Sequence, residues 1–264
     1  MSGTLADRLV RLVGIAAVAL AVLILLSPVA LTALLSFSGD SYFTFPPDSW
    51  GLRQYREALD DPQWAAAVRY SFEIAVPVAL LSAAIAVPTA FAIGRSRLPG
   101  RNALYAGGLA GIVVPLSAFA IALYGVFSEL GLHGTYVGLV LANTILAVPV
   151  MLIVVTAAMT RIPIDLELAA MAAGASRGRA WLGITARLLV PSIAAGGVLA
   201  FVTSFDEAVL IVFLGGVDQT TLPKAILDSA RFGVSPVITA VSTLLMLGTS
   251  VVAIAAVGLA RRGR

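Results

Sequence analysis

The stretch LELAAMAAGASRGRAW, residues 166–181, decides how this chain is classified. A carboxylate, two arginines and a run of small residues lie between two long apolar segments, in a chain of 264 residues that is 59% hydrophobic and 12% charged. Soluble domains are usually about 25% charged, so this composition indicates a membrane protein. A polar, alanine-rich stretch in such a chain predicts a helical loop outside the bilayer.

Six apolar segments are each near the roughly 20 residues that a helix needs to cross a hydrocarbon core of about 30 Å. We therefore predict an all-α integral membrane protein that forms a single transmembrane domain over residues 1–264. The expected spans lie at about residues 12–38, 65–94, 102–128, 135–160, 188–214 and 235–260. The first span is longer than the apolar core of a signal peptide and lacks a small-residue cleavage site, so we expect it to be retained.

The basic residues predict the orientation of the spans. With both termini in the cytoplasm, 12 of the 17 Lys and Arg residues lie inside. The inside residues are Arg8, Arg11, Arg95, Arg97, Arg101, Arg161, Arg177, Arg179, Arg187, Arg261, Arg262 and Arg264. The positive-inside rule therefore favours cytoplasmic termini. This asymmetry also accounts for the net charge of +3, so a nucleic-acid partner is not expected.

On this topology, residues 161–187 form the largest cytoplasmic loop. Pro163 suits the first turn of a helix, and the acids that follow it place negative charge near the positive end of that helix. Gly174 can adopt the left-handed conformation that ends a helix, after which Ser176 can cap a second one. The pattern predicts two short helices joined at a glycine elbow. Two interpretations stay open: a solvated hairpin that only connects two spans, or a docking element for a cytoplasmic partner.

The residues of this loop resemble the signature of the permease subunits of binding-protein-dependent ABC importers. That signature has Glu, two alanines and Gly, and further on an Ile or Val before Leu-Pro. The matching residues are Glu167, Ala169, Ala170, Gly174 and Ile184. One departure is that Ala186 and Arg187 stand where Leu-Pro is usual, and the next proline is Pro191. The resemblance implies that this coupling loop, residues 161–187, sits in a cleft on an ATPase through Glu167, Ala169, Ala170, Gly174, Ser176 and Arg177.

Further segments look like the polyamine-type branch of this family, which includes spermidine and putrescine permeases and relatives for ferric iron, phosphonate and opines. These segments are WGLRQYREAL at 50–59, LPG at 98–100, SFDEAVLIVFL at 204–214, TLPKAIL at 221–227 and SPVITAVSTLL at 235–245. The resemblance implies the type I importer permease fold of six helices, in a bacterial inner membrane, as half of a translocation pathway. Its implied partners are a second homologous permease, two ATPase subunits that carry ATP and magnesium, and an extracytoplasmic substrate-binding protein.

Other functional classes find little support in the sequence. The chain has no Gly-x-x-x-x-Gly-Lys-Ser/Thr loop and no hydrolase motif, so we do not expect it to be an enzyme or to bind a cofactor by itself. It has no cysteine, and its single histidine, His133, has no ligand cluster around it, so no metal site is predicted. A secondary transporter fits less well because no duplicated half is evident.

Two acids in the fifth predicted span are candidates for the solute pathway. Asp206 and Glu207 have no basic residue three or four positions away, and charge inside a bilayer is costly. Adjacent helical residues point about 100° apart, so one acid is expected to face the pathway. Together with Phe205 it would attract a cationic solute by charge and by cation–π contact. The alternative is that the acids pair with another subunit or bond to backbone near a helix break.

Two smaller features are expected on the outer side. Arg69 and Glu73 are four residues apart at the start of the second span, which predicts an ion pair on one helix face. Asp48 or Ser49 is expected to cap a helix that lies flat on the membrane. The apolar stripe of that helix would consist of Leu52, Tyr55 and Leu59.

Overall fold

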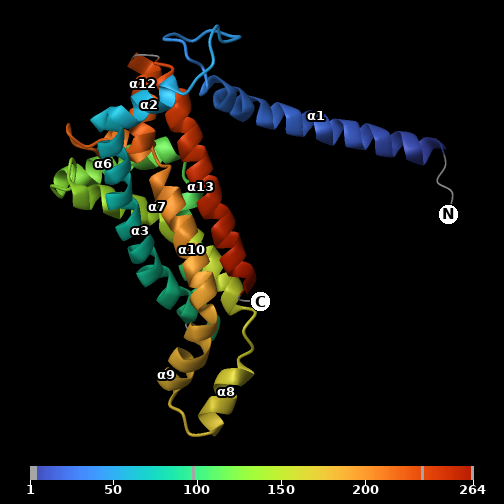
Figure 1. Ribbon diagram of the computed structural model, residues 1–264. Coiled ribbons are helices and arrows are strands. Elements are labelled where there is room, and N and C mark those ends of the chain that lie inside the picture. The colour runs from blue at the N-terminus through green and yellow to red at the C-terminus, as the bar shows by residue number, and fades with distance from the viewer. Residues whose placement is uncertain (1–4, 97–98, 233–234, 263–264) are drawn as a thin grey trace. The chain divides into compact units, whose positions relative to one another are not determined.

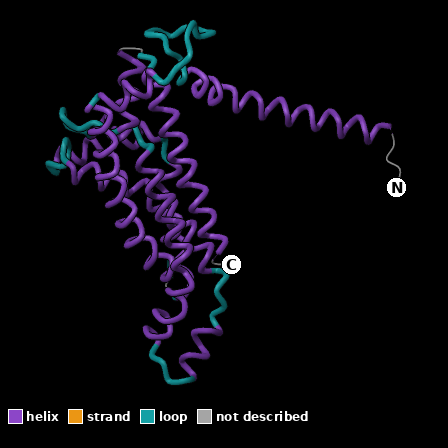
Figure 2. Tube along the Cα trace, in the orientation of Figure 1, coloured by secondary structure: helices purple, strands orange, loops and turns teal. Residues whose placement is uncertain are grey.

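The computed structural model describes residues 5–96, 99–232 and 235–262, which fold into helices joined by loops (Figures 1 and 2). Within these ranges the only extended pairing is an isolated antiparallel bridge between Ser38 and Trp50. The predicted all-α class is therefore confirmed. Two of the basic residues expected inside, Arg97 and Arg264, lie outside the described residues. So does Leu98, the first residue of the quoted segment at 98–100.

The chain divides into two compact units. The first comprises Met1–Asp61 with Ser229–Met246, and the second comprises Pro62–Asp228 with Leu247–Arg264. Two helices, α12 (Leu222–Phe232) and α13 (Val237–Arg262), contribute residues to both units.

A bundle of three long helices forms the centre of the second unit: α3 (Pro62–Arg95), α7 (Tyr136–Met159) and α10 (Arg187–Phe205). Each of the three packs along the other two, and the views in Figures 1 and 2 show them side by side. Small residues such as Ala75, Ala86 and Gly196 are buried in this bundle, and a Cβ added at Gly196 would lie 2.5 Å from Met151 Sδ of α7. Because lipid is as apolar as the side chains, such close backbone approach is a main source of packing energy between membrane helices.

The third predicted span is interrupted in the structure. Residues 102–128 are distributed over α4 (Arg101–Gly108), α5 (Ala110–Val113) and α6 (Leu116–Glu129). Pro115 lacks an amide hydrogen and disfavours a helical conformation in Val114, whose ψ is 131°. With 14 residues, α6 is about 21 Å long, which is shorter than the hydrocarbon core of about 30 Å.

Five rather than six helical runs of the described chain are long and apolar enough to cross a membrane. They are Leu9–Leu35, Pro62–Arg95, Tyr136–Met159, Arg177–Phe205 and Val237–Ala255. The first of these belongs to α1 (Leu5–Leu35), and none of the apolar window of this helix is buried within the chain.

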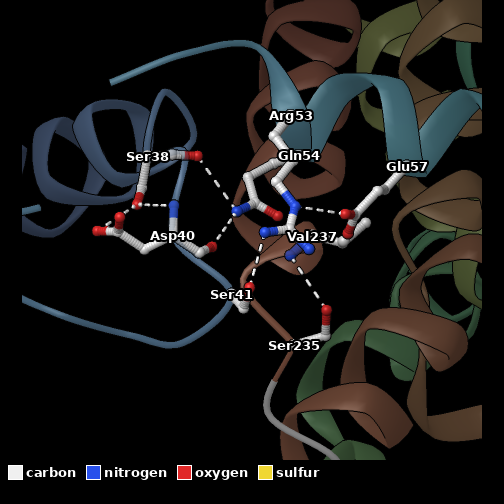
Figure 3. A network of polar contacts seen from close by, with 8 residues as sticks. All are labelled: Ser38, Asp40, Ser41, Arg53, Gln54, Glu57, Ser235 and Val237. Atoms are coloured by element: carbon white, nitrogen blue, oxygen red, sulfur yellow. Dashed lines mark hydrogen bonds and ion pairs between the residues drawn. The ribbon is translucent and has the colours of Figure 1, made fainter. Parts of the chain in front are cut away.

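The loop that follows α1 is closed by Asp40. Its carboxylate accepts five hydrogen bonds, from the hydroxyls of Ser38, Thr44 and Ser49 and from the backbone N–H groups of Asp48 and Ser49. Gln54, buried on α2 (Arg53–Asp60), donates its side-chain amide to the carbonyl oxygens of Ser38 and Asp40 (Figure 3). The loop and α2 are thereby joined into one polar network.

This network corrects the expected cap of the outer helix. Leu52, whose side chain is apolar, is the N-cap of α2 and supplies no side-chain hydrogen bond. The Ser49 hydroxyl donates to Asp40 instead. The residues of the expected apolar stripe, Leu52, Tyr55 and Leu59, also have different environments. The Tyr55 hydroxyl contacts Ser36 Oγ at 2.7 Å, whereas Leu52 and Leu59 are exposed.

The hydrogen bonds to Asp40 predict a pH-dependent loop. They lower the pKa of its carboxyl from 3.8 to about 2, with the Ser49 hydroxyl as the largest cause and the Thr44 hydroxyl as the second. Because the pKa is lower in the folded state, the stabilisation is present above pH 3.8 and is lost as the pH falls through about 2. Hydrogen exchange at the Asp48 and Ser49 amides, corrected for intrinsic rates, should therefore lose protection over this interval.

The same measurement at neutral pH tests whether the Asp40 carboxylate itself protects these amides, rather than other groups that are protonated at low pH. Asp40→Asn should accelerate exchange at the Asp48 and Ser49 amides, since the neutral side chain keeps only one acceptor oxygen. Asp60→Asn, on the exposed end of α2, serves as the matched control and should leave both amides protected. Equal protection in Asp40→Asn and the unsubstituted chain would contradict the assigned role of Asp40.

Candidate functional site

The coupling loop has the backbone that its sequence predicts. The first helix, α8 (Asp165–Ala172), ends before Gly174, whose φ of +95° lies in the left-handed region. The hydroxyl of Ser176 then accepts a hydrogen bond from the Arg179 N–H at 3.4 Å and caps α9 (Arg177–Ala180). The glycine elbow and the serine cap are confirmed. Pro163 lies just before α8 rather than in its first turn.

The second helix of the loop continues without interruption into the bundle. A six-residue π-helix, η1 (Trp181–Ala186), joins α9 to α10, so the helical run extends from Arg177 to Phe205. Ala186 and Arg187, in place of the usual Leu-Pro, keep this junction helical. Pro191 lies inside α10, within its first two turns.

Glu167 is the buried centre of the coupling loop. Only 8% of its side chain is exposed, and its Oε1 atom accepts a hydrogen bond from Arg95 Nε at 2.8 Å. The Thr185 hydroxyl, which is fully buried in η1, donates to the same oxygen. These three side chains, the Arg95–Glu167–Thr185 cluster, connect α3, α8 and η1.

Arg95, at the last position of α3, also binds the loop at two further points. Its Nη2 atom donates to the Ile162 carbonyl oxygen at 2.7 Å, and its own carbonyl oxygen accepts from Arg177 Nη2 at 3.3 Å. Arg177 is exposed apart from this bond. One side chain and its backbone therefore organise the segment before α8, α8 itself and the start of α9.

The remaining residues predicted for coupling lie at the surface of the loop. Ala169, Gly174 and Ser176 are exposed or partly exposed, and Ala170 is half-buried. Large apolar side chains accompany them on α8 and the residue before it, with exposed fractions of 40–52% for Ile164, Leu166, Leu168 and Met171. Figure 1 shows α8 and α9 at one end of the bundle formed by α3, α7 and α10. An apolar helix surface in this place has the character of a helix that inserts into a groove.

The fifth predicted span, residues 188–214, breaks at its two acids. The helix α10 ends at Phe205, and α11 (Val209–Leu214) starts after Ala208. Both carboxylate oxygens of Glu207 accept backbone hydrogen bonds at 2.7 Å, from Val209 N–H and Leu210 N–H. Glu207 therefore caps the first turn of α11, which agrees with the alternative of backbone bonding near a helix break.

Asp206 has a different environment. It is exposed, and within the described ranges its carboxylate has no hydrogen bond or ion pair. It follows Phe205, which belongs to a cluster of three aromatic rings with Phe72 and Phe201. The ring centroids are 5.0–5.5 Å apart, and Phe72 is 48% exposed. Phe205 itself is buried, with 7% of its surface exposed, so Phe72 is the exposed ring of this cluster.

Several residues at these sites were not predicted. The sequence singled out Arg95 only as a positive charge, and Thr185 not at all. Asn143, buried in α7, accepts a hydrogen bond from Ser204 Oγ at 3.3 Å and so links α7 to the end of α10. An amide inside an apolar span is a recognisable signal of such a link. The Arg69–Glu73 ion pair was predicted, and its Nε–Oε1 distance is 2.7 Å.

No group of three or more His, Asp or Glu residues that could hold a metal ion occurs in the described part of the chain. His133 packs edge-on against the ring of Tyr124, with centroids 4.8 Å apart.

Comparison with known proteins gives a family match for most of the chain. Residues 75–263 match the family described as binding-protein-dependent transport system inner membrane component. The putrescine transport system permease protein PotI of Escherichia coli strain K12 is 28% identical over 236 residues, which cover 86% of this chain and 83% of that protein. The spermidine/putrescine transport system permease protein PotC of the same strain is 27% identical, with coverage of 89% and 88%.

Other relatives are named for other solutes. The osmoprotective compounds uptake permease protein GgtD of Synechocystis is 32% identical over 166 residues, which cover 62% of this chain and 56% of that protein. Among solved structures, the crystal structure of a bacterial ABC transporter involved in the import of the acidic polysaccharide alginate matches with a TM-score of 0.71. It covers 96% of both chains at 17% sequence identity, a similarity that concerns the fold.

Proposed function

Since the chain belongs to the binding-protein-dependent transport system inner membrane components, the permeases of ABC importers, we propose that it forms half of a translocation pathway for a polyamine. The other half would be a second homologous permease. Two ATPase subunits with ATP and magnesium would drive transport, and an extracytoplasmic binding protein would deliver the solute. The chain is a multi-pass protein of the bacterial inner membrane, and we propose that it acts as one transmembrane domain with cytoplasmic termini.

The proposed ATPase contact is the exposed surface of the coupling loop. The single observation that supports it best is the combination of four exposed apolar side chains around α8 with a left-handed glycine at its end. A loop that only connected two spans would have no reason to present large apolar groups to water. Docking would cover these groups, and the fixed elbow would hold α8 at a defined angle.

The proposed solute contact is Asp206 with the nearby aromatic rings. Polyamines are cationic, and the two relatives named for putrescine and spermidine extend over more than four-fifths of this chain. Glu207 is bonded to backbone, so the carboxylate without a hydrogen-bond partner among the described residues is that of Asp206. Other solutes of the same branch, such as ferric iron, phosphonate or opines, are the competing assignment.

Reconstitution tests the proposal directly. The chain would be co-expressed with a second permease and with ATPase subunits, purified by a tag on the ATPase, and inserted into liposomes that enclose ATP and magnesium. With the binding protein outside, radiolabelled putrescine or spermidine should accumulate only when ATP is present. Recovery of a complex that accumulates another solute would reject the polyamine, and transport by the chain alone with an ion gradient would reject the ABC importer.

Replacing the elbow glycine tests the docking loop. No atom lies within 4 Å of a Cβ added at Gly174, so the penalty of Gly174→Val arises from the left-handed φ of 95° alone. Such strain costs about 1–3 kcal/mol, and recovery of the ATPase-bound complex should fall about tenfold. Gly178→Val is the matched control, because Gly178 also has open space around it but lies in helix α9. Equal recovery for both variants would show that the elbow is not needed for docking.

A further inference from the structure

We propose that the loop between α1 and α2, residues 36–52, is an aromatic anchor that binds the lipid interface of the bilayer at the end of the α1 span. The sequence predicts a membrane contact only for the helix that follows this loop. In the structure the loop itself exposes four aromatic side chains, by 40–79%: Tyr42, Phe43, Phe45 and Trp50. Aromatic rings of this kind are typical of the boundary between lipid headgroups and acyl chains. This membrane contact is independent of the transported solute.

The backbone keeps the anchor close to the end of the span. The candidate span Leu9–Leu35 belongs to α1, and the loop follows it directly (Figure 1). Ser38, three residues beyond the span, forms the antiparallel bridge with Trp50, and the Gly51 N–H donates to the Phe37 carbonyl oxygen at 2.8 Å. Three residues of chain reach at most about 11 Å. The bridge therefore keeps Trp50 near the level at which the span leaves the hydrocarbon core.

The chemical character of the loop matches a lipid interface. Residues 41–47 read SYFTFPP and contain no Asp, Glu, Lys or Arg. Asp40, which precedes them, has its carboxylate occupied by five hydrogen bonds from within the loop. Tyrosine and tryptophan combine an apolar ring with a polar group, so they satisfy both the acyl chains and the wet headgroups. No charge has to be taken out of water when residues 41–47 enter this layer.

The loop is closed before it meets a ligand. Besides the bonds to Asp40, the Gln54 amide attaches the loop to α2, and Arg53 Nη1 donates to the Ser41 hydroxyl at 2.7 Å (Figure 3). A preformed loop loses little conformational freedom when it binds, which favours binding. Its four exposed rings are thereby presented together rather than on a flexible segment.

The bilayer is a better occupant than a second protein. A partner that binds and dissociates would leave the four rings in water whenever it is absent, and such exposed apolar groups are unfavourable. The bilayer is present at all times, and it begins beside the same loop. We therefore assign the lipid interface as the occupant, with the extracytoplasmic binding protein as the competing one.

Spin labels measure the depth of the loop in proteoliposomes of the full chain. The chain has no cysteine, so a nitroxide attaches only at an introduced one. Tyr42→Cys and Phe45→Cys each keep three of the four rings, and Asp48→Cys is the matched control at an exposed acid of the same loop. At positions 42 and 45 the label should collide with oxygen dissolved in the bilayer and lose its collisions with a water-soluble nickel complex. At position 48 the collisions with nickel should persist.

A second pair of variants tests the closure of the loop. Asp40→Asn/Phe45→Cys weakens the hydrogen bonds that hold the loop together, so collisions of the label with the nickel complex should return. Asp60→Asn/Phe45→Cys removes an exposed acid of α2 instead and should keep the label protected. Equal protection in both variants would contradict the role of the closed loop.

Two results of the depth measurement would overturn the anchor. One is equal collision with nickel at positions 42, 45 and 48, which would place the whole loop in water. The other is protection at positions 42 and 45 that arises only after the purified binding protein is added, which would assign the rings to that protein. Because the measurement needs neither ATP nor solute, its outcome is distinguishable from failure of polyamine transport.

Discussion

Asp206→Asn is expected to leave the complex assembled and to lower polyamine uptake at least about tenfold, because a hydrogen bond to a charged group is worth about 1.5–3 kcal/mol. The substitution keeps the size and the polarity of the side chain and removes only the charge. Since the Asp206 carboxylate has no hydrogen bond or ion pair among the described residues, its loss leaves no buried donor unsatisfied. Uptake should therefore fall without a change in recovery.

Glu207→Gln should behave in the opposite way. The two carboxylate oxygens of Glu207 accept from Val209 N–H and Leu210 N–H, and glutamine can replace only one of these acceptors. The expected result is lower recovery of the complex, with unchanged uptake per recovered complex. Both quantities would be measured on one preparation, as ATPase-bound permease and as radiolabelled polyamine in proteoliposomes. Asp218→Asn, at an exposed position beyond α11, is the control for loss of an acid.

The assignment of the two acids fails if their phenotypes are exchanged. Normal recovery with reduced uptake in Glu207→Gln would place that residue in the pathway, and normal values for both variants would leave solute selection to the binding protein.

Gly138→Ala is expected to destabilise the bundle strongly. Gly138 lies in the first turn of α7, and its N–H donates to the Thr135 hydroxyl that caps this helix. A Cβ at this position would lie 2.1 Å from the carbonyl oxygen of Leu132. Because the clash is with backbone, no change of rotamer relieves it. We expect a loss of about 3 kcal/mol or more in stability, in the range of severe core substitutions.

The thermal midpoint of the purified chain in detergent measures this effect. Gly125→Ala is the matched control, because Gly125 is also helical, in α6, and nothing lies within 4 Å of its added Cβ. That control should be neutral or slightly stabilising, since alanine favours a helix by about 1 kcal/mol over glycine. Equal thermal midpoints for Gly138→Ala and the unsubstituted chain would show that the turn before α7 adjusts freely.

Local rules of the backbone explain what could be predicted from the sequence. The elbow at Gly174 and the cap at Ser176 depend on residues within one turn of each other, and both occur as expected. Pro115 indicates that the helix breaks in the third predicted span, but the apolar composition of residues 102–128 favoured a single span. Mean apolarity identifies a segment that can enter a bilayer, and it does not establish that the segment is one helix.

The parts that could not be predicted depend on contacts between distant residues. Arg95 and Glu167 are 72 residues apart, and neither spacing nor composition indicates that they meet. The roles of Asp206 and Glu207 depend on where α10 ends, which periodicity cannot fix. Helix geometry predicts that the side chains of the two acids point in different directions. The first N–H groups of α11 determine that Glu207 is the acid bonded to backbone.

The uninterrupted passage from the coupling loop into α10 makes this helix a lever. Pro191 removes one backbone hydrogen bond near the loop, and the 15 residues from there to Phe205 form an arm of about 22 Å. A tilt of about 10° at the proline would displace the far end by about 4 Å, which equals the separation of two carbon atoms in contact. A small tilt near the loop would thus be amplified at Phe205, at the far end of the helix.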